Sequence, residues 1–114
     1  AYYPTDPSPR YRDFRQRFLK RFDVEPSYAA AASYDGTSVL LQAMARQQRS
    51  ETLWDALLRH GPYEGLQNPI VFDRFGDART GMHFTEVRKG RFVYIATDAS
   101  AGDAPAAHPA APRR

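Results

Sequence analysis

The stretch from Tyr63 to Asp77 reads Tyr-Glu-Gly-Leu-Gln-Asn-Pro-Ile-Val-Phe-Asp-Arg-Phe-Gly-Asp. Its Gly, Asn-Pro and Asp residues are typical of turns, and they flank short apolar runs. Within it, Ile70-Val71-Phe72 is rich in β-branched and aromatic residues, which predicts a short buried strand. Asp73 and Asp77 can accept hydrogen bonds from nearby backbone N–H groups, and Gly76 can adopt a positive φ. The stretch therefore predicts a turn, a strand and a second turn.

Three amphipathic helices are predicted upstream of this stretch, because apolar residues recur three and four positions apart. Their ranges are Pro9–Phe22, Ser27–Arg46 and Glu51–Arg59, with Ser8, Ser27 and Ser50 as N-caps. The second helix contains four successive alanines, Ala29 to Ala32. Since alanines let a neighbouring backbone approach closely, we expect this helix to be the most buried.

Downstream, the alternating runs Met82–Val87 and Phe92–Ala96 flank a Lys-Gly pair, which predicts a β-hairpin. From Thr97 to Arg114 the chain is rich in Ala and Pro without periodicity, which predicts disorder. We expect an α/β chain, or α+β when taken by itself, with three helices, a short strand and a C-terminal hairpin. We expect an extended linker or hinge at residues 1–9, a folded portion at 10–96 and a tail at 97–114.

Composition restricts the function classes. A length of 114 residues suits one domain, and the absence of cysteine excludes disulfides and thiolate metal sites. The net charge of +3 comes largely from arginines and a lysine between residues 10 and 21, which suit either a solvated helix face or binding of nucleic acid or acidic lipid. No apolar run is long enough for a membrane span. Since the chain begins Ala-Tyr-Tyr-Pro without Met, we expect a piece of a longer protein.

No constellation of residues indicates catalysis. The histidines are His60, His83 and His108, and their spacing does not suggest a metal site. The carboxylates nearest a turn are Glu64, Asp73 and Asp77, which are too few at the wrong spacing for a calcium loop. Neither a nucleophile elbow nor a glycine-rich phosphate loop is present. We therefore expect no enzyme activity, no catalytic residues, no metal and no cofactor.

A resemblance to a known family rests on motifs in three places. The central stretch resembles the C-terminal signature of periplasmic amino-acid-binding proteins of the branched-chain (leucine/isoleucine/valine) type. It is carried by Tyr63, Gly65, Leu66, Pro69, Ile70, Phe72, Asp73, Gly76 and Asp77. Asn68 stands where that family usually has Gly, and Asn tolerates a left-handed conformation well. Tyr34-Asp35-Gly36 upstream and the pattern Glu-Val-Arg-x-Gly-x-Phe-Val from Glu86 to Val93 are also similar to the family.

The resemblance implies part of a two-lobed fold, the type I fold of periplasmic binding proteins, and a location in the periplasm. It implies capture of an amino acid or a related small polar ligand for an ABC transporter, with the transporter permease as a partner and no nucleic acid. The family places the start of the second helix at the ligand cleft. Tyr28 and Ala29 are therefore the candidate ligand-binding residues, together with Tyr3 from the hinge segment.

Two other functions fit the sequence: a small basic nucleic-acid-binding module that uses the Arg-rich first helix, and a ligand-sensing receptor domain of the same fold. The family architecture also implies that strands and helices of this chain pack on missing segments. We therefore expect open strand edges at Ile70–Phe72 and Met82–Ile95, an uncovered apolar face at Leu53, Trp54 and Leu57, and self-association of the isolated chain.

Overall fold

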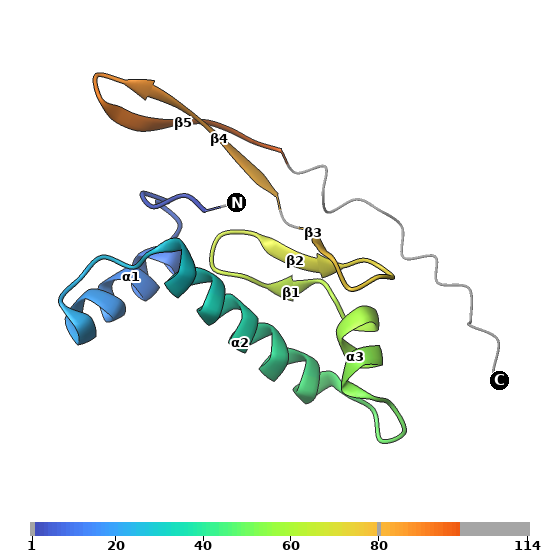
Figure 1. The fold of residues 1–114 in the computed structure, drawn as a ribbon. Coiled ribbons are helices and arrows are strands. Elements are labelled where there is room, and N and C mark those ends of the chain that lie inside the picture. Colours follow the sequence, from blue (N-terminus) through green and yellow to red (C-terminus); the bar gives the residue numbers. More distant parts are fainter. Residues whose placement is uncertain (1, 80, 99–114) are drawn as a thin grey trace.

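The computed structural model describes residues 2–79 and 81–98. The described residues form three helices and two small antiparallel sheets (Figure 1). The helices are α1 (Pro9–Phe22), α2 (Tyr28–Arg46) and α3 (Leu53–Arg59). The strands are β1 (Tyr63–Glu64), β2 (Pro69–Phe72), β3 (Ala78–Arg79), β4 (Met82–Arg88) and β5 (Arg91–Asp98). The predicted order of three helices, a short strand and a hairpin is confirmed.

The first two helices begin where the sequence predicts. Pro9 opens α1, where a missing N–H costs nothing. Ser8 is its N-cap, but the Ser8 hydroxyl makes no capping bond and is buried without a hydrogen-bond partner in the described part of the chain. Ser27 caps α2 through its side chain, which accepts a hydrogen bond from the Ala30 N–H at 3.3 Å.

The third helix begins later than expected, because Thr52 rather than Ser50 is its N-cap. The Thr52 hydroxyl accepts the Asp55 N–H at 3.1 Å and donates to the Asp55 carboxylate at 2.7 Å. Glu51 lies before the helix, and its carboxylate accepts the Gln48 N–H at 3.1 Å and meets His60 Nε2 at 2.7 Å. Glu51 therefore holds the loop between α2 and α3 instead of opening a helix.

The open edges expected at Ile70–Phe72 are covered in part. β2 pairs with β1 at Pro69 and Ile70 on one side and with β3 at Val71 and Phe72 on the other, both antiparallel. Pro69 lies opposite Glu64. This placement suits a residue without an N–H, because Glu64 directs both of its backbone groups to the side chain of Gln42 instead.

The turn between β2 and β3 is held by Asp73, as predicted for a capping carboxylate. Its Oδ1 accepts the N–H groups of Phe75 at 2.8 Å and Asp77 at 3.1 Å. Gly76 adopts a φ of 89°, in the left-handed region that favours glycine. The Trp54 ring covers this glycine so closely that a Cβ there would lie 2.4 Å from a ring carbon. Trp54 thus packs on the turn, although it stays 55% exposed.

The predicted hairpin is confirmed, and it projects away from the helices (Figure 1). Lys89 and Gly90 form its turn with φ values of 49° and 73°, the left-handed pair that matches strand twist. β5 continues to Asp98, so the prediction of disorder from Thr97 is wrong for residues 97 and 98, which pair with β4. The rest of the predicted tail, including His108, lies outside the described residues.

The core consists of two small clusters on either side of the middle of α2. One joins α1 and α2 to the loop after β1, through Tyr11, Phe14, Ala31 and Leu66. The other joins α2 to the sheet through Val39, Ala43, Tyr63 and Ile70. Both clusters use one stripe of α2, as expected for an amphipathic helix against a sheet.

α2 has more buried residues than either of the other described helices, as expected, but most of its surface is exposed. Its buried residues are Ala31, Val39 and Ala43. On its other faces, Leu41 is 62% exposed and Met44 57% exposed. The physical reason is that α2 packs on one layer, so its second apolar face has no covering layer within residues 2–79 and 81–98.

Gly65→Ala should destabilise the chain by about 1–3 kcal/mol, because the new Cβ would lie 2.3 Å from the Asn68 carbonyl oxygen. Gly36→Ala is the matched control, since within the described residues no atom beyond its chain neighbours and its own helix backbone lies within 4 Å of the place that a Cβ would take there. Because Gly36 lies inside α2, alanine there should stabilise the chain by about 1 kcal/mol. Urea denaturation of both variants measures the two free energies of unfolding, and equal shifts in one direction would contradict the Gly65 contact.

Candidate functional site

A groove of about 500 Å³ runs between α2 and the sheet. α2 contributes a stripe of side chains to it, and the sheet contributes the apolar side chains of β2 and the preceding loop. The lining residues from α2 are Tyr28, Ala31, Ala32, Asp35, Gly36, Val39 and Leu40, and those from the sheet region are Leu66, Gln67, Asn68, Ile70, Phe72 and Ala78. Tyr2 and Leu57 complete the lining. A mostly apolar groove with a few polar groups is typical of a small-molecule site and also of a packing surface.

The predicted ligand residue Tyr28 lies in the first turn of α2, at the groove. Its side chain is 65% exposed and lies edge-to-face with Tyr2 at a centroid distance of 6.2 Å. Ala29 is exposed and follows it. The Ser27 side chain accepts the Ala30 N–H. The Tyr28 and Ala29 N–H groups, at the start of the helix, have no hydrogen-bond partner within the described residues.

The structure places Tyr3 apart from Tyr28. Tyr3 is 9% exposed and does not line the groove. Its ring packs on the hairpin, with centroid distances of 5.9 Å to His83 and 5.6 Å to Tyr94. Its neighbour Tyr2 is the residue that the fold brings to Tyr28, because adjacent side chains of an extended segment point to opposite sides.

Tyr2 is fixed by its hydroxyl. That hydroxyl donates to the Pro26 carbonyl at 2.7 Å and lies 2.8 Å from the Tyr11 hydroxyl. Because the single Tyr2 proton goes to Pro26, the Tyr11 hydroxyl is the donor in the second bond. Burial, and then this bond to Tyr2, raise the pKa of Tyr11 well above its ordinary value. The hydroxyl pair thus joins the first residues of the chain to α1 and to the start of α2.

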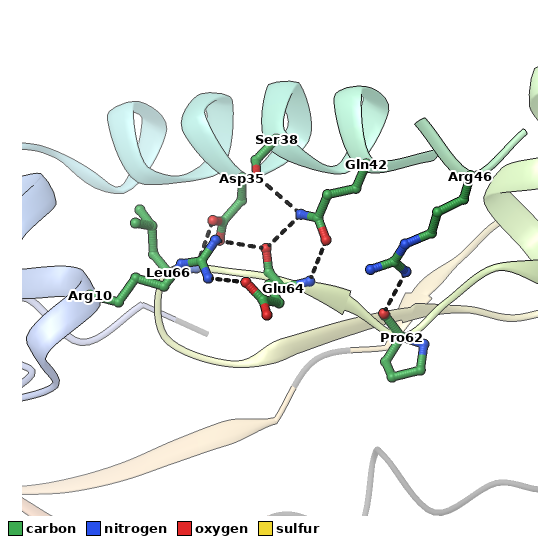
Figure 2. A network of polar contacts seen from close by, with 8 residues as sticks. All are labelled: Arg10, Asp35, Ser38, Gln42, Arg46, Pro62, Glu64 and Leu66. Atoms are coloured by element: carbon green, nitrogen blue, oxygen red, sulfur yellow. Dashed lines mark hydrogen bonds and ion pairs between the residues drawn. The ribbon is translucent and has the colours of Figure 1, made fainter. Parts of the chain in front are cut away.

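A polar network ties α1, α2 and β1 together along one side of the groove (Figure 2). Gln42 accepts the Glu64 N–H at 3.0 Å and donates to the Glu64 carbonyl at 3.1 Å. Arg10 pairs with the Glu64 carboxylate at 2.5 Å. Asp35 accepts the Leu66 N–H at 2.8 Å. These polar groups, of which Asp35 lines the groove, therefore hold β1 and its following loop on α2.

Arg46 forms a second part of this network at the C-terminal end of α2. Its guanidinium donates to the carbonyls of His60 at 2.6 Å and Pro62 at 3.2 Å, and lies 5.3 Å from the centroid of the Tyr63 ring. A cation over an aromatic face and two backbone carbonyls orient the segment that leads into β1. The hydrogen bonds of Gln42, Gln67 and Arg46 to distant backbone groups were not predicted from the sequence. Glutamine and arginine on a helix or in a turn are ordinarily solvated, and no sequence pattern marks the ones that are not.

Three of the basic residues of α1 form ion pairs that agree with a solvated helix face. Arg15 pairs with Glu25, Arg17 with Asp13 and Arg10 with Glu64. Such pairs leave less free positive charge for a phosphate backbone than the sequence suggests.

Metal sites and membrane spans are both absent from the described part of the chain. Among residues 2–79 and 81–98, no three His, Cys, Asp or Glu side chains lie close enough to hold a metal ion. None of the described helices is both long and apolar enough to cross a membrane.

The family model described as "Periplasmic binding protein" matches residues 1–91. The chain belongs to this family. Periplasmic binding proteins are extracytoplasmic proteins that bind substrates and are a class distinct from enzymes. The resemblance drawn from the central stretch is thus confirmed, and neither the nucleic-acid-binding module nor the receptor domain is favoured.

Two solved structures support the same fold. An ABC transporter substrate-binding protein from Desulfitobacterium hafniense, in complex with Leu, has 30% sequence identity and a TM-score of 0.68, covering 82% of this chain and 29% of that one. A leucine-binding protein from Thermotoga maritima has 24% identity and a TM-score of 0.62, covering 84% of this chain and 28% of that one. The chain therefore spans less than a third of the length of these binding proteins. A comparison with curated protein sequences gave no match.

Asp35→Asn should change how the stability of this binding-protein segment depends on pH. Burial raises the pKa of Asp35, and the Leu66 N–H and Arg10 offset this in part. The folded chain therefore holds the Asp35 proton more tightly than the unfolded chain, so this group's contribution to stability falls as the pH rises through the ordinary and then the raised pKa. Asparagine can still accept the Leu66 N–H but does not titrate.

We expect the Asp35→Asn variant to gain stability over the wild type between about pH 3 and pH 7. Urea denaturation at several pH values measures the difference. A constant difference would show that the bond to Leu66 and the charge of Arg10 balance burial, and a difference in the opposite direction would show that they outweigh it.

Proposed function

We propose that this chain is part of an extracytoplasmic solute-binding protein that captures an amino acid or a related small polar molecule for an ABC transporter. The observation that carries the proposal is the alignment of 82% of the chain, at 30% identity, with a substrate-binding protein crystallised with Leu. The groove beside α2 is consistent with it, because its walls are mostly apolar and suit an aliphatic side chain. The periplasm as location and a transporter permease as partner belong to the same proposal.

The start of α2 is the proposed ligand-contacting part of this chain. The Tyr28 and Ala29 N–H groups at a helix N-terminus suit a carboxylate, and the exposed Tyr28 ring suits contact with an aliphatic side chain. Tyr3, with its ring against the hairpin, contributes indirectly by holding its neighbour Tyr2 beside Tyr28. The chain offers one wall of a site, and a ligand also needs groups from the rest of the two lobes.

Leucine should therefore bind weakly or not at all to the isolated chain, and should bind in a polypeptide that completes both lobes. In that polypeptide Tyr28→Ala should weaken leucine binding about tenfold or more, since a buried aromatic contact contributes about 1–2 kcal/mol. Isothermal titration calorimetry with leucine measures both effects. Arg49→Ala, at an exposed loop residue outside the groove, serves as the control.

Micromolar binding of leucine to the isolated chain would show that the site has been misplaced. Wild-type affinity of the Tyr28→Ala polypeptide would remove Tyr28 from the site but leave the family assignment standing. Failure of the completed polypeptide to bind any of the twenty amino acids would reject the proposed ligand class.

Self-association of the isolated chain is also proposed. The hairpin exposes apolar side chains on both strands, including Val87 at 66% and Phe92 at 67%. Leu41 and Met44 of α2 are exposed as well. Since surfaces of this kind are costly in water, a second copy is the simplest cover, by pairing of the β4 or β5 edge or by exchange of the hairpin.

Light scattering should give more than one chain per particle at concentrations above about 100 μM, a range typical of weak interfaces. Replacing Val87 and Phe92 together with Lys should shift the particles toward one chain, because charges on an exposed strand oppose edge pairing. A double replacement of Arg49 and Arg59 with Lys is a control that alters no exposed apolar surface. A monomer with a cooperative melt at every concentration would reject this proposal.

A further inference from the structure

The side chain of Gln67 forms hydrogen bonds with the backbone of a residue 64 positions away. Its Oε1 accepts the Tyr3 N–H at 3.0 Å, and its Nε2 donates to the Tyr3 carbonyl. A residue of a neighbouring strand makes this same pair of bonds. The amide of Gln67 therefore takes the place of a strand and fixes the direction in which the chain passes residue 3.

The next side chain, Asn68, reaches the hairpin. Its Nδ2 lies 2.8 Å from His83 Nε2, near the start of β4. The Tyr3 ring completes the connection, since it lies against both His83 and Tyr94. Two consecutive side chains thus hold the first residues of the chain and the base of the hairpin at one point.

Among the described residues, this point is where side chains connect the hairpin to the helices and the N-terminal segment. Within residues 2–79 and 81–98, β4 and β5 pack extensively on each other, and neither packs extensively on another helix or strand. Their remaining side chains, such as Phe92 and Ile95, are largely exposed. The direction of the hairpin relative to α2 and the sheet is therefore set where Gln67, Asn68 and Tyr3 meet its base.

The same point also fixes Tyr2. Tyr2 directly precedes Tyr3. The Tyr2 ring lies against Tyr28, and the Tyr2 hydroxyl donates to the Pro26 carbonyl. A displacement of Tyr3 by the hairpin would therefore move Tyr2 against the start of α2.

We propose that Gln67 and Asn68 are positioning residues that join the hairpin and the Tyr2–Tyr28 pair in one mechanical unit, so that rotation of the hairpin moves the wall of the groove. The consequence for ligand capture rests on the proposed function, whereas the joint itself does not.

The chain contains a matched control for this joint. Gln42 makes the same two bonds, with Oε1 and Nε2, to the backbone of Glu64, but inside the body formed by α2 and β1. Methionine is close to glutamine in shape and makes neither bond. Each of the variants Gln67→Met and Gln42→Met therefore removes two hydrogen bonds to the backbone. Gln67→Met removes them at the joint, and Gln42→Met removes them inside the body formed by α2 and β1.

Spin labels can report the direction of the hairpin. Because the chain contains no cysteine, two introduced cysteines would be the only sites that a thiol-reactive label modifies. Arg49→Cys, in the loop after α2, and Arg91→Cys, at the hairpin turn, are both exposed. Pulsed electron paramagnetic resonance on the full chain, diluted with unlabelled chain to suppress contacts between copies, gives the distribution of the distance between them. We expect that distribution to become at least twice as wide in Gln67→Met and to stay unchanged in Gln42→Met.

Amide hydrogen exchange supplies a second readout that does not depend on the labels. The Tyr3 N–H should exchange at least ten times faster in Gln67→Met than in the wild type. Gln67→Glu keeps an oxygen acceptor for this N–H and should retain most of its protection. An unchanged distance distribution in Gln67→Met, equal broadening by Gln42→Met, or wild-type exchange of the Tyr3 amide in Gln67→Met would each overturn the proposal, and none of these results depends on leucine binding.

Discussion

The burial of Tyr63 is the contact on which the helices and the sheet depend. Its ring is 1% exposed and packs with Val39 and Ala43 of α2 and with Ile70 of β2. A buried hydroxyl is costly without a partner, and the Tyr63 hydroxyl finds one by donating to the Ala56 carbonyl of α3 at 2.7 Å. One side chain thus connects α2, α3 and the sheet, and truncating it would leave a cavity at the place where all three meet.

α2 packs on the sheet with one face, and nothing among the described residues covers its opposite face. α2 lies on the sheet through a narrow stripe, and its outer face, the groove and the hairpin remain in contact with solvent. This exposure agrees with the comparison, in which the chain spans less than a third of the binding proteins that share its fold.

Much of this fold could be predicted from the sequence where a local pattern carries the information. The stripe of α1, the Ser27 cap and the Lys89-Gly90 turn each follow from the chemistry of a few neighbouring residues. β1 and β3 could not be found in this way, because strands of two residues show no alternation. The start of α3 was missed because serine is ordinarily the better N-cap of the two, whereas the bond from the Asp55 N–H selects Thr52.

The candidate site was less predictable, because it depends on contacts between distant residues. The family resemblance led to Tyr28 and Ala29 at the start of α2, but whether Tyr2 or Tyr3 faces them depends on the direction of an irregular segment. That direction is set by Gln67, a glutamine among turn residues whose role no local pattern reveals. The exposure of α2 could not be predicted either, since an apolar residue type does not show whether a covering layer is present.

The Gln42 side chain has a consequence for the way in which this sheet meets other strands. Because Gln42 occupies both outward backbone groups of Glu64, the free margin of β1 offers no donor or acceptor to an incoming chain at that residue. α2 therefore both packs on the sheet and blocks strand pairing at the outer edge of β1. Within the described residues, the strand edges that remain for pairing with a further chain are those of β3 and of the hairpin, which projects away from the β1 side (Figure 1).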